Sequence, residues 1–159
     1  MSDLVRVAVD AMGGDYAPVE PVKGAVEAVN ADERVKVQLV GQVDVIEKEL
    51  QKYTYPKERV EIVPATEIIE TGEPPVNAIR HKKDSSIVVG MKKVRCGEAD
   101  AFVSSGSTGA VLVGGQTIVG RIKGVERPPL APLIPTKDGV SLLIDCGANA
   151  ECTSEYLLQ

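Results

Sequence analysis

The sequence predicts an α/β fold: an open, largely parallel sheet with helices on both faces. Along the 159 residues, short aliphatic runs alternate with segments of helical periodicity, an order typical of parallel strands joined by right-handed crossovers. Aromatic residues make up only 3% of the chain and Trp is absent. The core must therefore be built from Val, Ile, Leu and Ala, as in sheets that helices cover on both sides. A chain of this length fits one compact domain, residues 1–159.

The first strand and helix are predicted close to the N-terminus. Residues 5–9 form an apolar run that ends at Asp10. Pro18 and Pro21 indicate the start of a helix, because proline is tolerated in the first turn. The apolar residues that follow fall at i, i+3, i+4 and i+7, which is one buried face of a helix. They are Val22, Ala25, Val26 and Val29.

The second and third strands are predicted at residues 35–40 and 60–63, closed by a glycine and a proline. Between them, Asp44 and Glu47 have the spacing of a capping box, with Asp in place of the usual Ser or Thr. The helix behind this box carries Val45, Ile46, Leu50 and Tyr53.

A further helix and the fourth strand follow. Residues 84–86, Asp-Ser-Ser, predict a capped helix that runs to about Arg95, with Gly97 as its stop signal. Residues 101–104 predict the fourth strand, which leads into the loop 105–109.

The last third of the chain predicts one more strand and two helices. A helix is expected from about residue 110 to 122, then a proline-rich connecting stretch at 127–132. Residues 140–145 predict a fifth strand of the same sheet, and residues 151–159 begin a capped helix.

Composition excludes several classes of function. The net charge of −5 argues against a nucleic-acid groove, which needs a concentrated positive surface. Cys96, Cys146 and Cys152 fit neither a disulfide framework nor a zinc site, so we expect a reducing cytoplasm. We find no signal-peptide pattern and no apolar stretch of membrane-spanning length. No metal and no cofactor is predicted, and Cys146 is expected to be a buried, inert thiol.

Three polar, glycine-rich loops follow predicted strands, at residues 10–15, 104–109 and 145–149. Ligands of open parallel sheets bind beyond the C-terminal ends of the strands, so these loops are expected to converge. The loop at 105–109 suits an anion, because glycines allow close approach and a helix start presents free N–H groups. The alternative is a tight turn with an ordinary N-cap. Neither loop 10–15 nor loop 105–109 has the spacing of a Walker A or dinucleotide fingerprint.

A second candidate anion site is the helix start at Ser85 and Ser86, just after the basic residues 80–83. A guanidinium and helix N–H groups suit a phosphate dianion. The alternative is a capped surface helix with a solvated basic turn. His81, within that turn, is expected to be an exposed surface side chain.

Five segments together resemble the PlsX family of bacterial phosphate acyltransferases. The string Asp-Ala-Met-Gly-Gly-Asp at residues 10–15 is highly specific to that family, and the other segments occur in the family's order at compatible spacing. Ser107 departs from the pattern, because the family more typically carries Asn there. The segments are residues 9–15, 80–86, 97–101, 104–109 and 145–149.

The resemblance implies transfer of a long-chain acyl group from acyl carrier protein to inorganic phosphate, giving acyl phosphate for phospholipid synthesis. It implies a Rossmann-like three-layer fold, similar to the isocitrate dehydrogenase and phosphotransacetylase group. Residues 1–159 would be the N-terminal portion of one catalytic domain. The family likeness also implies a homodimer, with peripheral contact to the downstream glycerol-3-phosphate acyltransferase at the inner face of the cell membrane.

In that chemistry phosphate is the nucleophile, so the protein must position it and stabilise the developing oxyanion. The resemblance assigns loop-organising roles to Asp10, Asp15 and Asp145. Catalytic roles are assigned to Arg80, Ser85, Ser86, Gly106, Thr108 and Asn149. Phosphate contacts are assigned to Gly13, Gly14, Ser105, Gly106, Ser107, Thr108 and Gly109.

Three other functions stay open at this point. A phosphotransacetylase-like enzyme would use acyl coenzyme A as donor, and a non-catalytic phosphate-binding module would bind without turnover. A nucleotide-dependent dehydrogenase is the third, and the missing fingerprint counts against it.

Overall fold

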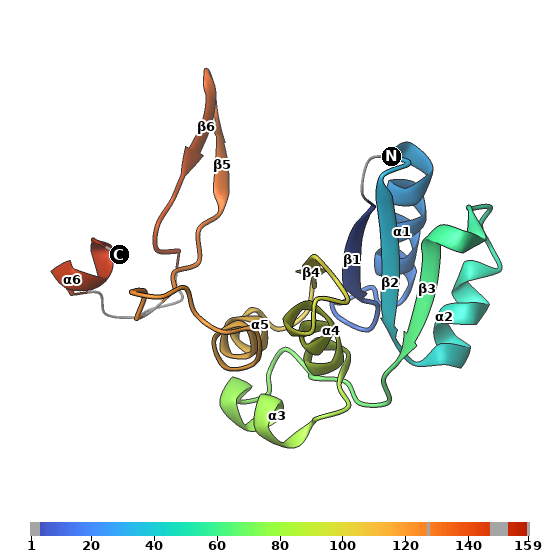
Figure 1. Cartoon of the computed structure of the whole chain (residues 1–159), viewed down its shortest axis with the longest axis horizontal. Helices are drawn as coiled ribbons and strands as arrows, with labels where there is room; N and C mark the ends of the chain where they lie inside the picture. The colour runs from blue at the N-terminus through green and yellow to red at the C-terminus, as the bar shows by residue number, and fades with distance from the viewer. Residues whose placement is uncertain (1–3, 127, 147–152, 159) are drawn as a thin grey trace. The chain divides into compact units, whose positions relative to one another are not determined.

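The computed structural model describes residues 4–126, 128–146 and 153–158 (Figure 1). The chain divides into two compact units, residues 1–119 and 120–159. The expectation of a single domain over residues 1–159 stays a prediction. The first unit holds the parallel sheet and two of the three glycine-rich loops, residues 10–15 and 104–109.

The first unit is built on a four-stranded parallel sheet of order β3-β2-β1-β4, which confirms the α/β prediction. Residues with β-branched side chains dominate these strands, as expected for a sheet buried on both faces. β1 lies centrally, pairing Val7 with Val37 of β2 and with Ala101 of β4. The strands are β1 (Val5–Asp10), β2 (Val35–Gly41), β3 (Val60–Pro64) and β4 (Ala101–Val103).

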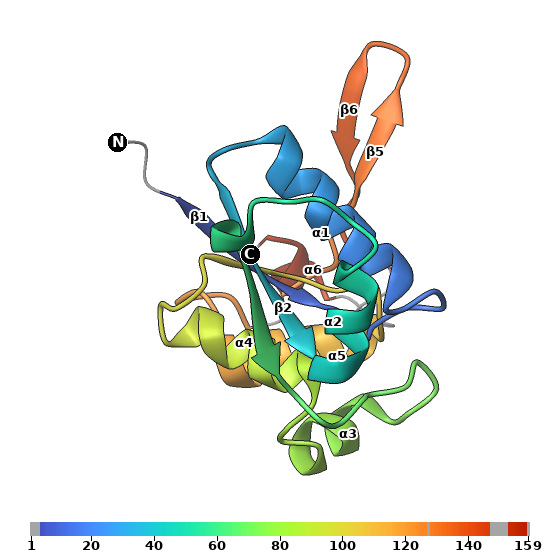
Figure 2. The ribbon, with the colours of Figure 1, turned by 90° about the vertical axis from the view of Figure 1, so that its right-hand side faces the viewer.

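Two helices cover one face of this sheet, α1 (Val19–Ala31) and α2 (Val43–Leu50) (Figures 1 and 2). The predicted apolar face of α1 is confirmed, since its four residues are its buried ones. They pack with residues of β2 and α2, among them Leu39 and Ile46, in one hydrophobic cluster. Burial of aliphatic side chains at about 25 cal/mol per Å² makes such a cluster the main source of stability.

The capping box predicted for α2 is wrong. Only Gln42 separates β2 from the helix, so the helix begins at Val43, before Asp44 can act as N-cap. The N-cap is Gln42, and its side chain makes no capping hydrogen bond. Asp44 lies in the first turn, where a carboxylate still favours the helix dipole. Tyr53 lies beyond the end of α2, although it packs against the same hydrophobic cluster.

α4 (Ser86–Arg95) lies on the other face of the sheet (Figures 1 and 2). Its Val89 and Val94 pack against a cluster that includes Ala8 of β1 and Val40 of β2. The predicted cap is confirmed, because the Ser85 side chain accepts a hydrogen bond from the backbone N–H of Val88. The predicted stop is also confirmed, since Gly97 adopts φ +70, a conformation that favours glycine.

We expect Gly90→Ala to lower the free energy of unfolding by about 1–3 kcal/mol through overpacking. A Cβ at Gly90 of α4 would lie 2.5 Å from Cε2 of Phe102, a ring that packs in two hydrophobic clusters. Urea denaturation provides the measurement. The matched control is Gly24→Ala in α1, where a Cβ meets nothing within 4 Å, and where the better helix propensity of Ala should raise stability. Equal midpoints for the two variants would contradict the prediction.

α3 (Pro75–His81) and α5 (Thr108–Gly114) complete the first unit, with a short 3₁₀ turn at Lys57–Arg59 before β3. α5 begins two residues earlier than predicted, because Ser107 acts as its N-cap. It then continues as a π-helical segment, Gly115–Val119, and ends before Ile122. Ile79 of α3 and Met91 of α4 contact the position of Gly114, so the three helices pack together.

The second unit corrects one strand prediction. β6 (Gly139–Leu142) pairs antiparallel with β5 (Leu133–Thr136) in a separate two-stranded sheet, so residues 140–145 do not form a fifth parallel strand. The hairpin turn is Lys137-Asp138, followed by Gly139. Asp-Gly between apolar runs is a strong hairpin signal, which the strand prediction did not use.

Two further features belong to this unit. The capped terminal helix is confirmed as α6 (Ser154–Leu157), with Thr153 as N-cap. Cys146 is exposed, so the expectation of a buried thiol is wrong. In the described residues of the whole chain, no helix is long and apolar enough to cross a membrane.

Candidate functional site

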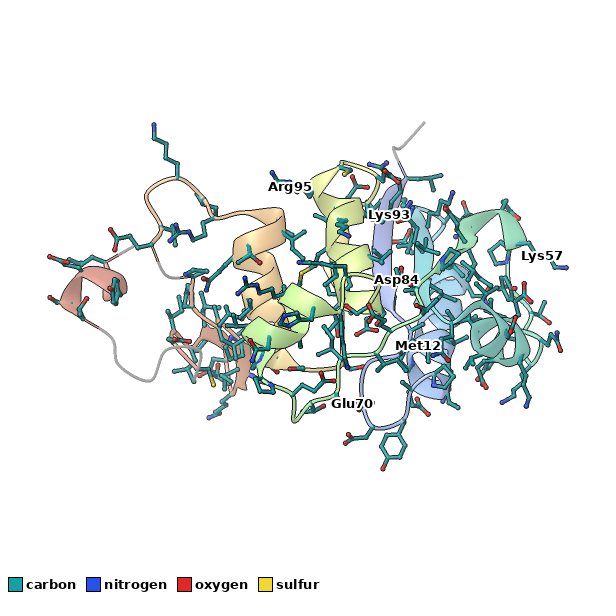
Figure 3. All side chains as sticks on the ribbon, turned by 90° about the horizontal axis from the view of Figure 1, so that it is seen from below. Met12, Lys57, Glu70, Asp84, Lys93 and Arg95 are labelled. Carbon is teal, nitrogen blue, oxygen red and sulfur yellow. The ribbon has the colours of Figure 1, made fainter. Side chains whose placement is uncertain are left out.

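The candidate site lies at the C-terminal edge of the parallel sheet, viewed in Figure 3 with Met12 and Asp84 labelled. β1 and β4 are parallel neighbours, so the loop after β1 and the loop after β4 leave the sheet side by side. The predicted convergence is therefore present for residues 10–15 and 104–109. The third loop, residues 145–149, begins in the second unit and lies mostly outside the described residues, so its convergence stays a prediction. Ligands of open parallel sheets bind at this edge.

Asp10 joins the two loops from a position that is only 1% exposed. Its Oδ2 accepts a hydrogen bond from the Ser104 hydroxyl at 2.7 Å, and its Oδ1 accepts from the backbone N–H of Met12 at 3.1 Å. The Ser104 Oγ in turn accepts from the N–H of Gly106 at 3.0 Å. One buried carboxylate thus fixes both loops, which is the kind of contact that a loop-organising residue makes.

Gly13 and Gly14 allow the loops to approach closely. A Cβ at Gly13 would overlap the Asp10 carboxylate and lie 3.0 Å from the backbone nitrogen of Gly106. Gly14 adopts φ +98, and a Cβ there would lie 2.9 Å from Ser105 Oγ. The Ser105 hydroxyl also donates a hydrogen bond to the Gly13 carbonyl at 3.0 Å. Side chains at either glycine would separate the two loops.

The loop after β4 leads directly into the first turn of α5. Ser107 is 2% exposed, and its Oγ accepts from the N–H of Ala110 at 3.3 Å. Thr108 is exposed, and its N–H and that of Gly109 are first-turn groups that have no partner within a helix. Gly109 also has a packing role, since a Cβ there would lie 2.6 Å from Cγ of Pro75 in α3. The N–H of Gly106, by contrast, is committed to Ser104.

Ser85 and Ser86 are buried at 0% and 1% exposure. The Ser85 hydroxyl donates to the carbonyl of Lys82 at 2.9 Å and accepts from the N–H of Val88 at 3.3 Å. The N–H of Ser86 donates to the carbonyl of Glu67. The backbone of Ser86 therefore holds the start of α4 against Glu67, and the contacts of Ser85 leave its proton engaged.

The basic turn is only partly solvated. Lys82 Nζ contacts Glu73 Oε1 at 2.5 Å and donates to the Ile68 carbonyl at 2.6 Å. Lys83 Nζ donates to the Ile79 carbonyl at 3.1 Å. Arg80 is exposed in the last turn of α3, and within residues 4–126 it makes no hydrogen bond with either glycine-rich loop. His81 is exposed as expected, with Nδ1 2.9 Å from the Asn77 carbonyl.

The contacts described above do not involve three of the predicted residues. Asp15 is exposed. Asp145 lies in the second unit, where its Oδ1 accepts from the N–H of Leu130 at 2.9 Å. Asn149 lies outside the described residues. The roles predicted for these three stay predictions.

Asp84 ties the start of α4 to the segment after β3. Its Oδ2 accepts from the Thr66 hydroxyl at 2.5 Å and from the Thr66 N–H at 2.9 Å. These bonds, the side-chain one first, hold the pKa of Asp84 below its usual value. Ala65 donates to the Gly41 carbonyl, and a Cβ at Gly41 would lie 2.8 Å from Met12 Sδ. Asp84 and loop 10–15 therefore belong to one connected edge.

We expect Asp84→Asn to lower the melting temperature at pH 7 and to lose this effect in acid. Because the pKa of Asp84 is lower in the folded state, its contribution is complete above the unfolded value near about 3.9 and disappears as the pH falls through the folded pKa. Melting curves of both proteins between pH 2 and 7 would measure it. Glu27→Gln, on the exposed side of α1, is the control. A difference between wild type and Asp84→Asn that persists at the lowest pH would contradict this account.

Two features of the site were not predicted from the sequence. Ser104 is predicted at the end of the strand and in the loop 104–109 but without a role of its own, yet its hydroxyl bridges Asp10 and Gly106. An apolar cavity of about 420 Å³ lies between α1 and the sheet and ends at Asp10, Ser104 and Ser105. The one sequence feature that could have indicated this cavity is Gly24, a glycine in the middle of α1 that lines it. In the described residues, no cluster of His, Cys, Asp and Glu could hold a metal ion.

Comparison with known proteins gives one family. Residues 5–159 match the family model described as "Fatty acid synthesis protein". "Phosphate acyltransferase" of Alkaliphilus oremlandii (strain OhILAs) is 52% identical over 156 residues, covering 98% of this chain and 46% of that protein. The protein of the same name from Clostridium kluyveri is 50% identical over 153 residues, covering 96% and 46%. That from Clostridioides difficile (strain 630) is 47% identical over 156 residues, covering 98% and 46%. The chain spans about half the length of these relatives.

Proposed function

Because the chain belongs to the fatty acid synthesis protein family, that of the PlsX-type phosphate acyltransferases, we propose that the full-length protein transfers a long-chain acyl group to inorganic phosphate. The donor is acyl carrier protein and the product is an acyl phosphate used in phospholipid synthesis. The observation that carries this proposal is the pair of glycine-rich loops locked by buried Asp10 at the edge of a parallel sheet.

The reaction requires little from side chains. A phosphate oxygen attacks the thioester carbonyl, the C–S bond breaks, and the carrier protein leaves as a thiol that has taken the proton of the attacking hydrogen phosphate. The protein must hold phosphate beside the carbonyl and stabilise the oxyanion that develops there. Glycines at positions 13, 14 and 106 let the two loops approach each other closely, which fixes the backbone beside which the substrates would lie. The free N–H groups of Thr108 and Gly109, with the Thr108 hydroxyl, are the donors that this chain offers.

The remaining predicted residues have narrower roles in this proposal. Asp10 organises the loops and does not itself hold phosphate, since two anions repel. Ser85 and Ser86 support the site through the start of α4. Arg80 is exposed and suits the approach of an anion or of the carrier protein. A homodimer, a cytoplasmic location and peripheral membrane contact belong to the proposal for the whole protein.

The test uses the full-length protein with palmitoyl carrier protein, measuring phosphate-dependent release of thiol and trapping acyl phosphate with hydroxylamine. Thiol release that requires phosphate and yields hydroxamate supports the proposal. Turnover only with acyl coenzyme A would make the protein phosphotransacetylase-like. Phosphate binding without turnover of any donor would leave a binding module, and the proposal would be wrong.

A further inference from the structure

The apolar cavity of the first unit runs along α1 from the site to the opposite edge of the sheet. Its volume is about 420 Å³, within the range of small-molecule pockets. One end is lined by Asp10, Ser104 and Ser105, and the other by Ala28 and Val35. Val35 pairs with Val5 at the start of β1, so the cavity follows the strands over most of their length.

The wall of this cavity is almost entirely aliphatic. Between its two ends lie Val7, Val9 and Val37 of the sheet and the small residues of α1. Val103 of β4 forms part of the lining and is 53% exposed. Glu20 is the other charged residue beside Asp10 on this lining, and it is exposed in the first turn of α1. Two carboxylates disfavour a free fatty acid, whose own carboxylate they would repel, but they do not disfavour a neutral acyl thioester.

Gly24 forms part of the cavity wall and is exposed. It lies in the middle of a 13-residue helix, where glycine costs about 1 kcal/mol relative to Ala. A Cβ at this position meets no atom within 4 Å, so packing within the first unit gives no reason for glycine. The glycine instead removes a side chain from the wall of the cavity.

We propose that this cavity binds the hydrocarbon chain of the acyl donor, with the carbonyl at the Asp10–Ser104–Ser105 end and the chain end near Ala28 and Val35. The proposal rests on the phosphate acyltransferase function proposed above. The main support is that the cavity is continuous with the candidate site, because Asp10 and Ser104 line the cavity and also join the two loops. A chain lying in the cavity therefore presents its thioester at the loops.

The test compares full-length wild type with Gly24→Leu, using hexanoyl and palmitoyl carrier protein as donors. Leucine at position 24 fills the cavity, so the ratio of kcat/KM for palmitoyl over hexanoyl donor should fall about tenfold, equivalent to about two buried methylene groups. Lys23→Leu adds the same side chain at an exposed position of α1 that does not line the cavity and should leave the ratio unchanged. An unchanged ratio in Gly24→Leu overturns the inference. So does an equal loss for both donors, because that result means that another part of the protein covers this face.

Photo-crosslinking gives a second measurement on the unaltered protein, in case Gly24→Leu does not fold. A palmitoyl carrier protein with a diazirine at the chain end should label the peptides that contain Ala28 and Val35. Labelling only elsewhere overturns the inference. Wild-type turnover in the same preparation separates this failure from failure of the proposed function, which would abolish turnover with every carrier-protein donor.

Discussion

Gly13→Ala is expected to lower kcat/KM of the full-length enzyme about 100-fold while leaving it folded. The new methyl group would overlap the Asp10 carboxylate and press on the backbone nitrogen of Gly106. Neither neighbour can yield easily, because Asp10 is held by two hydrogen bonds and Gly106 by Ser104. The loops must therefore separate, and a displacement of about 1 Å at a reacting centre costs on the order of 100-fold.

Steady-state kinetics with palmitoyl carrier protein would measure this effect, with circular dichroism and thermal melting to verify the fold. Gly72→Ala is the matched control, since Gly72 is an exposed loop glycine with no atom within 4 Å of a Cβ. Overpacking costs about 1–3 kcal/mol, less than the stability of a typical domain. Activity within a few-fold of wild type would show that the loop spacing does not matter for catalysis.

The second large effect is expected for Asp10→Ala, which should lower the free energy of unfolding by about 3–5 kcal/mol. The substitution leaves the N–H of Met12 and the hydroxyl of Ser104 without their acceptor in a buried site. Hydrogen bonds to a charged group contribute about 1.5–3 kcal/mol each, and a buried donor without an acceptor is costly. Urea denaturation of the full-length protein would give the value.

Comparing Asp10→Asn with Asp10→Ala separates the effect of losing the charge from the effect of losing the hydrogen bonds to Met12 and Ser104. Asparagine keeps the size of the side chain and one oxygen acceptor, so it should lose about half as much stability as the alanine variant. Ser104→Ala removes one of the two bonds to Asp10 and should fall between wild type and Asp10→Ala. A stability loss below about 1 kcal/mol in Asp10→Ala would contradict the role of this carboxylate in joining the loops.

Much of the first unit could be predicted because local patterns and tertiary packing agree there. The spacing of Val22, Ala25, Val26 and Val29 matches a helix, and the same four residues meet the sheet. The parallel sheet was predictable from the order of aliphatic runs and helices. Convergence of the loops at residues 10–15 and 104–109 then followed from topology alone, without knowledge of any side-chain contact.

The wrong or missing predictions concern features that depend on three-dimensional geometry rather than on residue type. Only one residue connects β2 to α2, so the helix begins before Asp44. A capping pattern in the sequence does not show how long the connection to the preceding strand is. Residues 140–142 are as aliphatic as a strand of the main sheet, yet the turn at Lys137-Asp138 pairs them with β5. The cavity beside Gly24 depends on residues of α1 and three strands, and no segment of the sequence shows it by itself.

The order of strands in the sheet has a consequence for how the chain folds. β1, β2 and β3 follow one another in the sequence and are neighbours in the sheet. β4, the other neighbour of β1, is synthesised only after β3, α3 and α4. Asp10 and its partner Ser104 are 94 residues apart, and such distant contacts close late because of their loop-closure entropy. During synthesis, strands β1 to β3 with α1 and α2 leave the ribosome before β4, at a time when the loop at residues 10–15 still lacks its partner Ser104. The site is thus among the last parts of this unit to acquire protection from amide hydrogen exchange.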